Sequence, residues 1–138
     1  MSKYRKIRDV LIIDDDPILH EIVGAFVEQH GAERVLNASD GEMAIRVLQE
    51  PDHRIGLIFC DLNMPQKDGI EVLTHLRQSN SDIPLVIASS AEGHIVRSAR
   101  ELAEAYSLNL VGTLCKPIDF EGLRRVMAVV NGEDLCLA

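Results

Sequence analysis

The stretch Val10-Leu-Ile-Ile-Asp-Asp-Asp-Pro17 is the strongest indication of the fold in the 138-residue chain. Its four apolar residues form a short run, mostly β-branched, which is typical of a strand buried on both faces of a parallel sheet. Three aspartates end the run, and Pro17 suits the first turn of a helix. The stretch therefore predicts a buried strand, an acidic strand end and a helix.

Similar apolar runs recur along the chain. Residues 57–60, 85–88 and 108–115 are the other candidates for buried strands, and residues 34–38 suit an edge strand. Between the strands, apolar residues repeat at the spacing of a helix face. The five sets are Ile18, Leu19, Ile22, Val23, Phe26 and Val27; Met43, Ala44, Val47 and Leu48; Ile70, Leu73 and Leu76; Ile95, Ala99, Leu102, Ala103 and Tyr106; and Leu123, Val126, Met127 and Val130.

Polar residues mark where several of these helices should begin. Ser39 and Glu42 have the spacing of a capping box before the second helix. Asp119 is placed to cap the fifth helix, and Asp68-Gly69 fits a turn before the third. The helix boundaries therefore agree with the apolar pattern.

The elements alternate as strand and helix, five times over. Such alternation implies a parallel sheet with right-handed crossovers and helices on both faces. The predicted fold class is α/β, a flavodoxin-like (βα)5 doubly wound sandwich with a parallel five-stranded sheet in the order 2-1-3-4-5. We expect one domain over residues 1–131, with residues 132–138 as a C-terminal tail or the start of a linker.

The composition argues against nucleic-acid binding. The chain has 22 acidic and 14 basic residues and a net charge of −8, whereas phosphate backbones are held by clustered Lys and Arg. The apolar run at 10–13 is too short for a signal peptide or a membrane span. Cys60, Cys115 and Cys136 lack CxxC spacing, so we interpret them as reduced thiols of a cytoplasmic protein, the first two in the core. The histidines are expected at the surface.

Polar residues follow four of the predicted strands. These strand ends carry Asp14-Asp15-Asp16, Asp61, Ser89-Ser90 and Lys116-Pro117. Because the carboxyl ends of parallel strands lie at one edge of the sheet, the side chains are expected to meet there. Carboxylates gathered in this way repel one another and need a cation, and oxygen ligands favour Mg²⁺, with Mn²⁺ as an alternative.

This combination of groups suits phosphoryl transfer. A carboxylate beside Mg²⁺ can attack a phosphoryl group and hold it as an acyl phosphate, while the metal and Lys116 neutralise charge on the transferred group. Ser89 or Ser90 would hydrogen-bond a phosphoryl oxygen, and counting along the strand favours Ser89. A cis Lys116-Pro117 bond would aim the lysine inward. Asp16 is interpreted as a loop or helix-cap residue, not as a ligand.

These motifs together resemble the receiver domain of bacterial two-component response regulators, the CheY-like family. The resemblance covers residues 10–131 and rests on Asp14-Asp15, the stretch Cys60-Asp-Leu-Asn-Met-Pro-Gln-Lys-Asp-Gly69, Ser89 and Lys116-Pro117, in that order. It implies that Asp61 accepts a phosphoryl group from a sensor histidine kinase or a histidine phosphotransfer protein.

The resemblance also implies a role for each of the other site residues. Asp14, Asp15 and Asp61, with the backbone carbonyl of Asn63, would hold Mg²⁺. Ser89 would be the switch hydroxyl, and Lys116 would pair with the phosphoryl group. Phosphorylation would then change a partner-binding face made of helix 4, strand 5 and helix 5, which would also suit a homodimer. An unidentified output partner, or an effector domain on another segment, would recognise that face.

Two features depart from the family pattern. Thr113 stands where many receivers have an aromatic residue on strand 5, and a threonine cannot fill the same space. The stretch between Ser89 and Lys116 is longer than in compact receivers. It is similar to receivers fused to EAL-type cyclic-di-GMP phosphodiesterase domains.

Two other functions compete with this one. A haloacid-dehalogenase-like phosphatase would use Asp14 as nucleophile together with Asp16, but Ile18 stands where that family has threonine or valine. A degenerate receiver would serve only as a docking or dimer module, which the complete acceptor set argues against. A working receiver would not be an enzyme, since it would catalyse only its own phosphorylation and dephosphorylation.

Overall fold

Five strands form one parallel sheet in the computed structural model, which describes residues 7–64, 68–90 and 93–132. The order across the sheet is β2-β1-β3-β4-β5, which confirms the predicted flavodoxin-like topology. The strands are β1 (Asp9–Ile13), β2 (Arg34–Ala38), β3 (Ile55–Asp61), β4 (Leu85–Ser89) and β5 (Leu110–Cys115). The inner strands β1, β3 and β4 are almost fully buried, whereas β2 and β5 are edges.

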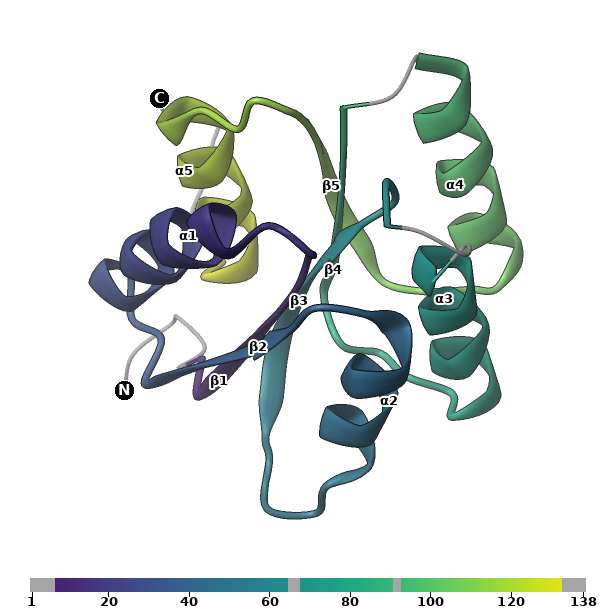
Figure 1. Cartoon of the computed structure of the whole chain (residues 1–138), viewed down its shortest axis with the longest axis horizontal. Helices are drawn as coiled ribbons and strands as arrows, with labels where there is room; N and C mark the ends of the chain where they lie inside the picture. Colours follow the sequence, from purple (N-terminus) through teal and green to yellow (C-terminus); the bar gives the residue numbers. More distant parts are fainter. Residues whose placement is uncertain (1–6, 65–67, 91–92, 133–138) are drawn as a thin grey trace.

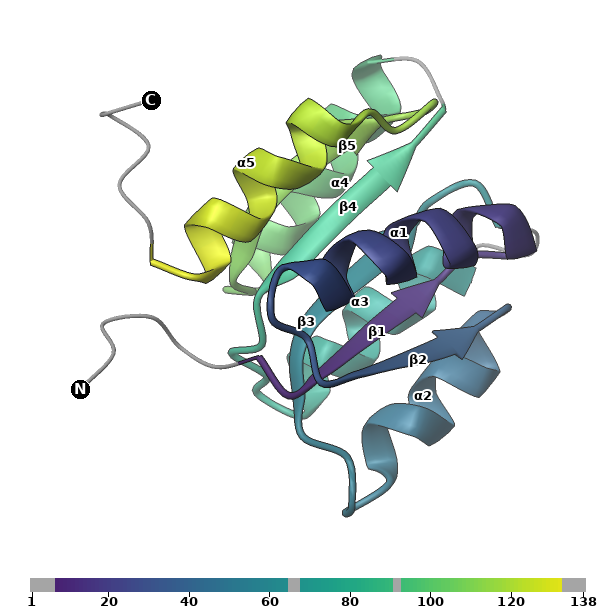
Figure 2. The ribbon, with the colours of Figure 1, turned by 90° about the vertical axis from the view of Figure 1, so that its left-hand side faces the viewer.

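Helices cover both faces of the sheet (Figures 1 and 2). The helices are α1 (Pro17–Gln29), α2 (Gly41–Gln49), α3 (Asp68–Gln78), α4 (Gly93–Ala105) and α5 (Phe120–Val130). Helices α1 and α5 lie on one face, and α2, α3 and α4 lie on the other. The doubly wound sandwich predicted from the alternating pattern is therefore confirmed.

Each face of the sheet has its own apolar core. Because side chains alternate along a strand, Ile12 of β1 packs with the α1 and α5 residues, whereas Leu11 packs with α2, α3 and α4. Both side chains are fully buried. Burial of one such side chain stabilises the fold by about 1.5–3 kcal/mol, so β1 holds the two layers together.

Aspartate side chains begin three of the helices. Asp16 accepts a hydrogen bond from the N–H of Ile18 at 3.0 Å, and Asp119 caps α5, as predicted. The capping box expected at Ser39 is wrong by one residue. The N-cap of α2 is Asp40, whose carboxylate accepts from the N–H of Met43 at 2.7 Å.

The predicted apolar face of α1 is wider than the stripe that the structure buries. Val23 and Val27 are buried, but Ile18 is 64% and Ile22 44% exposed. The expectation that all of these residues face the core is therefore wrong for Ile18 and Ile22. Only the narrow stripe of α1 that faces the sheet is covered, and the flanking positions stay in solvent.

Three boundaries also differ from the sequence prediction. Asp68 and Gly69 belong to the first turn of α3 instead of a turn before it. Strand β5 begins at Leu110, two residues later than expected, and Tyr106 lies just beyond the end of α4. Among the described residues, no helix is both long and apolar enough to cross a membrane.

Candidate functional site

The register of the sheet brings the polar strand ends together. Ile13 of β1 lies opposite Cys60 of β3, so the next residues, Asp14 and Asp61, meet at the carboxyl edge. On the other side of β4, the N–H of Lys116 donates to the carbonyl of Ser89 at 3.0 Å. The convergence predicted for the strand ends is therefore present.

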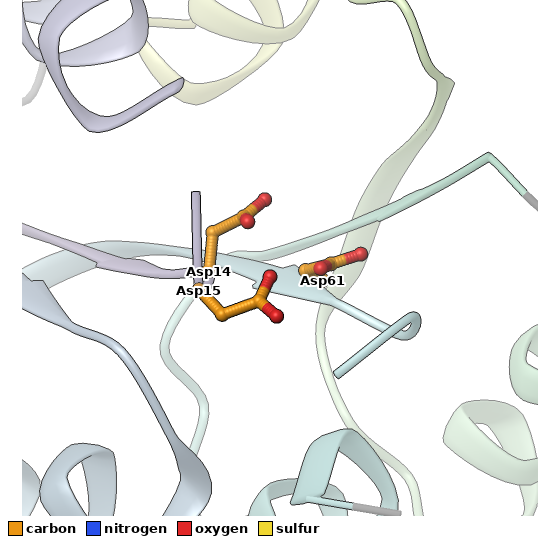
Figure 3. A group of neighbouring side chains, drawn as sticks. All are labelled: Asp14, Asp15 and Asp61. Atoms are coloured by element: carbon orange, nitrogen blue, oxygen red, sulfur yellow. The ribbon is translucent and has the colours of Figure 1, made fainter. Parts of the chain in front are cut away.

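Three carboxylates gather at this edge (Figure 3). One oxygen of each of Asp14, Asp15 and Asp61 lies within 4.8 Å of the others. Asp14 and Asp61 are buried and Asp15 is exposed. A set of oxygen ligands with one open side is the arrangement that suits Mg²⁺, which keeps several of its waters when bound. The side chains present therefore fit a hard divalent cation.

Asp14 is held by hydrogen bonds on all of its polar atoms. Its N–H donates to Ala38 at 3.0 Å, its Oδ1 accepts from the N–H of Asp16 at 2.9 Å, and its Oδ2 accepts from Nζ of Lys116 at 2.7 Å. Its carbonyl oxygen lies 2.6 Å from Nε2 of His20. The carboxylate of Asp14 is therefore fixed in place by the protein itself.

Asp61 combines a held oxygen with an open one. Its Oδ1 accepts from the N–H of Asn63 at 3.0 Å. Its Oδ2 is buried and has no hydrogen-bond partner among the described residues, although Nζ of Lys116 lies 3.3 Å away. Burial raises the pKa of Asp61 above its ordinary value, and the charge of Asp14 adds to this, against the lowering effects of Asn63 and Lys116.

Lys116 is the cation of the site. Burial by itself lowers its pKa, but the hydrogen bond to Asp14 and the charges of Asp61 and Asp14 outweigh that effect and hold the pKa above the ordinary value. The ammonium group is therefore charged beside two carboxylates. The Lys116–Pro117 peptide bond is cis.

Ser89 and Asn63 connect the ends of β4 and β3. Ser89 is fully buried, and its hydroxyl donates to Oδ1 of Asn63 at 2.9 Å. The N–H of Ser90 donates to the same oxygen at 2.7 Å, while the Ser90 residue is exposed. The inward position expected for Ser89, in preference to Ser90, is therefore the one found.

Gly69 allows α3 to approach the site closely. A Cβ atom at this position would lie 2.8 Å from the carbonyl oxygen of Asp61. No real side chain fits at that distance, so glycine is required by the close approach of the two backbones.

Comparison with known proteins assigns the family. Residues 10–128 match the family model of the response regulator receiver domain. The chain belongs to the response regulator receiver family. The resemblance stated from the strand-end motifs is thereby confirmed.

The curated relatives of this receiver are longer proteins. The chain is 31% identical to the transcriptional regulatory protein MalR of Bacillus subtilis, over 87% of this chain and 48% of MalR. It is 24% identical to the cyclic di-GMP phosphodiesterase RocR of Pseudomonas aeruginosa, over 89% of this chain and 31% of RocR. The chain therefore spans less than half the length of these relatives.

Solved structures match over nearly their whole length. A response regulator from Colwellia psychrerythraea has a TM-score of 0.77 at 26% identity, covering 92% of this chain and 99% of that one. The chemotaxis response regulator CheY4 of Vibrio cholerae has a TM-score of 0.72 at 24% identity, covering 90% and 98%. The receiver fold is thus shared with proteins that differ at about three residues in four.

A hollow lies beside the threonine on β5 at the surface of the receiver. Thr113 is half-buried, and its Oγ1 accepts from Arg100 of α4 at 3.0 Å. A hollow of about 310 Å³ lies beside them and is also lined by Leu108, Leu110 and Gly112. Arg100, to which no pattern in the sequence pointed, therefore contacts the threonine beside this hollow.

The expectation that Cys60 lies in the core is confirmed, whereas the expectations for Cys115 and for the histidines need correction. Cys60 is buried, and burial raises the pKa of its thiol to about 12. Cys115, however, is exposed at the end of the edge strand β5 and is not a core residue. The histidines at 20, 30, 53 and 75 are half-buried instead of lying freely at the surface.

The contacts of Asp16 distinguish between its two predicted roles, a helix cap and a phosphatase residue. Its carboxylate caps α1, which agrees with the helix-cap interpretation and does not favour its use in a phosphatase. Other expectations fall outside the described residues. These concern residues 65–67 of the Cys60–Gly69 stretch, and Cys136.

Proposed function

We propose that this receiver accepts a phosphoryl group on Asp61 from a phosphohistidine of a sensor histidine kinase or a histidine phosphotransfer protein. The observation that carries the proposal is the state of Asp61: a buried carboxylate whose Oδ2 accepts no hydrogen bond from the described residues and lies 3.3 Å from Nζ of Lys116. Oδ2 would attack phosphorus, the P–N bond to the imidazole would break, and an acyl phosphate would form on Asp61.

The carboxylates of Asp14, Asp15 and Asp61 and the backbone carbonyl of Asn63 would hold Mg²⁺, and Mn²⁺ would fit the same oxygens. When bound, the ion supplies positive charge that offsets the negative charge of the phosphoryl oxygens. Lys116 would provide further positive charge by turning part of its hydrogen bonding from Asp14 to a phosphoryl oxygen. Asp15, the exposed member of the set, would be the most direct ligand.

Phosphorylation would act as a switch through Ser89. At rest its hydroxyl donates to Asn63. A phosphoryl oxygen on Asp61 would offer a charged acceptor, and hydrogen bonds to charged groups are about twice as strong as neutral ones. Ser89 would exchange one acceptor for the other, and the surface of α4, β5 and α5 would change its packing. Arg100 and Thr113 lie on that surface.

The output of the switch would come from a partner that binds this surface, from a second copy of the chain, or from an effector segment. Its curated relatives include a transcriptional regulatory protein and a cyclic di-GMP phosphodiesterase, both much longer than this chain. We propose a receiver unit over residues 1–131, with 132–138 as a tail or linker. It would act in the cytoplasm, without binding nucleic acid itself.

The test is phosphorylation by a small phosphodonor. The chain is incubated with Mg²⁺ and acetyl phosphate, and its intact mass is followed. We expect the addition of one phosphoryl group, which Asp61→Ala abolishes. Asp16→Ala is the matched control, because the described contact of the Asp16 side chain is the cap of α1, and the backbone N–H that donates to Asp14 is kept. The proposal is wrong if the wild type gains no phosphoryl group, or if Asp61→Ala gains it equally well.

A further inference from the structure

His20 makes a contact that the proposed phosphoryl transfer does not use. Its Nε2 lies 2.6 Å from the carbonyl oxygen of Asp14, and because a carbonyl only accepts, the ring nitrogen must donate. The backbone N–H of His20 donates to the carbonyl of Asp16 at 3.3 Å. The half-buried ring thus folds back from the first turn of α1 over the acidic turn, which consists of Asp14, Asp15 and Asp16.

We propose that His20 is a positioning residue for the cation site. Its hydrogen bond would hold the peptide group between Asp14 and Asp15, so that the carboxylate of Asp15 faces Asp61. The inference rests on the proposed magnesium site. In this inference His20 donates to the backbone next to the proposed ligand Asp15 and does not itself contact the ion.

His20 and its neighbours hold different atoms of Asp14. The side chain of Asp14 is already fixed by Asp16 and Lys116, and its N–H by Ala38. In the described part of the chain, only the His20 ring donates to the Asp14 carbonyl. Loss of the ring therefore leaves Asp14 anchored but frees the peptide that carries Asp15.

Asp15 is the ligand most sensitive to such freedom. It is exposed, and the structure shows no hydrogen bond to its carboxylate within residues 7–64, 68–90 and 93–132. Its direction is therefore set by its own backbone. Groups that orient metal ligands from behind typically change metal affinity about 10–100-fold when they are removed.

The chain offers a matched control in His53. His53 lies in the connection between α2 and the amino end of β3. Its ring nitrogen Nδ1 lies 2.9 Å from the carbonyl oxygen of Val47 in α2. This is the same kind of bond, from a half-buried histidine to a backbone carbonyl, at the opposite edge of the sheet. Its loss tests what removal of such a bond does by itself.

Isothermal titration with Mg²⁺, at one fixed pH, compares the wild type with three variants. His20→Met keeps side-chain bulk without a donor, and we expect Mg²⁺ to bind it about tenfold more weakly. His20→Gln retains an N–H donor and should recover most of the affinity, whereas His53→Met should bind like the wild type. Equal affinity of His20→Met and wild type, or equal weakening by His53→Met, would overturn the inference.

A second measurement needs no variant and decides the matter if His20→Met does not fold. The ¹⁵N resonances of the His20 ring in the wild type report which nitrogen carries the proton. A proton on Nε2, slow to exchange with water, supports the inference, and a proton on Nδ1 alone contradicts it. A wild type that binds no Mg²⁺ would instead refute the proposed metal site, and with it this role of His20.

Discussion

The hydroxyl of Ser89 donates to Oδ1 of Asn63 at 2.9 Å, so the residue proposed to sense phosphorylation is bonded to the loop that follows the proposed phosphoacceptor. The N–H of Ser90 donates to the same oxygen at 2.7 Å. Both bonds link the end of β4 to the end of β3. Any movement of Ser89 toward Asp61 must give up its bond to Asn63.

Asn63→Ala should therefore favour the switched conformation before any phosphorylation. A net hydrogen bond contributes about 0.5–1.5 kcal/mol, and losing two would shift the resting equilibrium about 5–150-fold. We expect faster amide exchange in the β5 segment without phosphodonor, measured by mass spectrometry. Asn37→Ala, which replaces an exposed asparagine on β2, is the control. Unchanged exchange in Asn63→Ala would show that the bonds do not hold the resting state.

Asp61→Asn should stabilise the metal-free protein at neutral pH. The folded-state pKa of Asp61 is raised, so the folded protein holds its proton more tightly than the unfolded chain. The stability this provides is present at low pH and is lost as the pH rises through the folded pKa. The melting temperature of Asp61→Asn should exceed that of the wild type at pH 7, by about 3–4 °C for each kcal/mol gained.

That difference should also depend on pH and on Mg²⁺. It should shrink below the ordinary carboxyl pKa, where the wild-type side chain is neutral as well. It should shrink on addition of Mg²⁺, which stabilises only a protein that binds it. A variant less stable than the wild type at pH 7 without metal would mean that Asp61 is stabilised as an anion.

Asp9→Ala should destabilise the opposite edge of the sheet. Asp9 is buried, and it accepts from Nε and a terminal nitrogen of Arg34 at 3.1 and 2.8 Å and from the N–H of Arg54 at 2.8 Å. Because Arg34 is half-exposed, solvent screens the ion pair. We expect a loss of about 1–2 kcal/mol, measured by urea unfolding.

The Asp9 contribution should have the opposite pH dependence to that of Asp61. Its hydrogen bond to Arg34 lowers its pKa from the ordinary 3.8, so the stability is present above 3.8 and is lost as the pH falls through the lower folded value. Glu42→Gln, which breaks an exposed ion pair with Arg46, is the control and should cost less than about 0.5 kcal/mol. Equal effects of both variants would contradict the importance of burial.

Two helical glycines should respond to alanine in opposite ways. A Cβ at Gly24 of α1 would meet a Val35 methyl at an ordinary 3.5 Å, and Gly24→Ala should gain about 0.5–1 kcal/mol. Gly69→Ala would push against the Asp61 carbonyl and should lose about 1–3 kcal/mol and slow phosphorylation. Thermal unfolding and phosphoryl incorporation measure the two effects. A neutral Gly69→Ala would show that α3 can move away at little cost.

The parts of the fold that depend on periodic burial were predictable from the sequence. The runs at 10–13, 57–60 and 85–88 are buried on both faces, so no polar residue interrupts them, and they became the inner strands. The site was predictable for the same reason, because parallel strands place their carboxyl ends together. The last residues of β3 and β4 are Asp61 and Ser89, and the residues directly after β1 and β5 are Asp14 and Lys116.

Contacts that a long side chain makes with a residue on another element could not be predicted in this way. His20 was expected at the surface because an isolated histidine gives no pattern, although its position one turn after the helix cap places its ring near Asp14. Arg100 reaches Thr113 across the space between α4 and β5, and no spacing in the sequence relates the two. Ser39 has the capping-box spacing to Glu42, but the N-cap of α2 is the adjacent Asp40, because the backbone direction there brings the Asp40 carboxylate to the N–H of Met43.

The many bonds of Asp14 have a thermodynamic consequence. Because neighbouring groups already restrain this carboxylate, its loss of conformational entropy belongs to the folding of the domain and not to the arrival of a ligand. A divalent ion would therefore meet two ordered carboxylates, Asp14 and Asp61, and would have to immobilise chiefly Asp15. Changes in ion affinity among variants of this chain should thus appear mainly in the entropy of binding, and they should follow the mobility of that one residue.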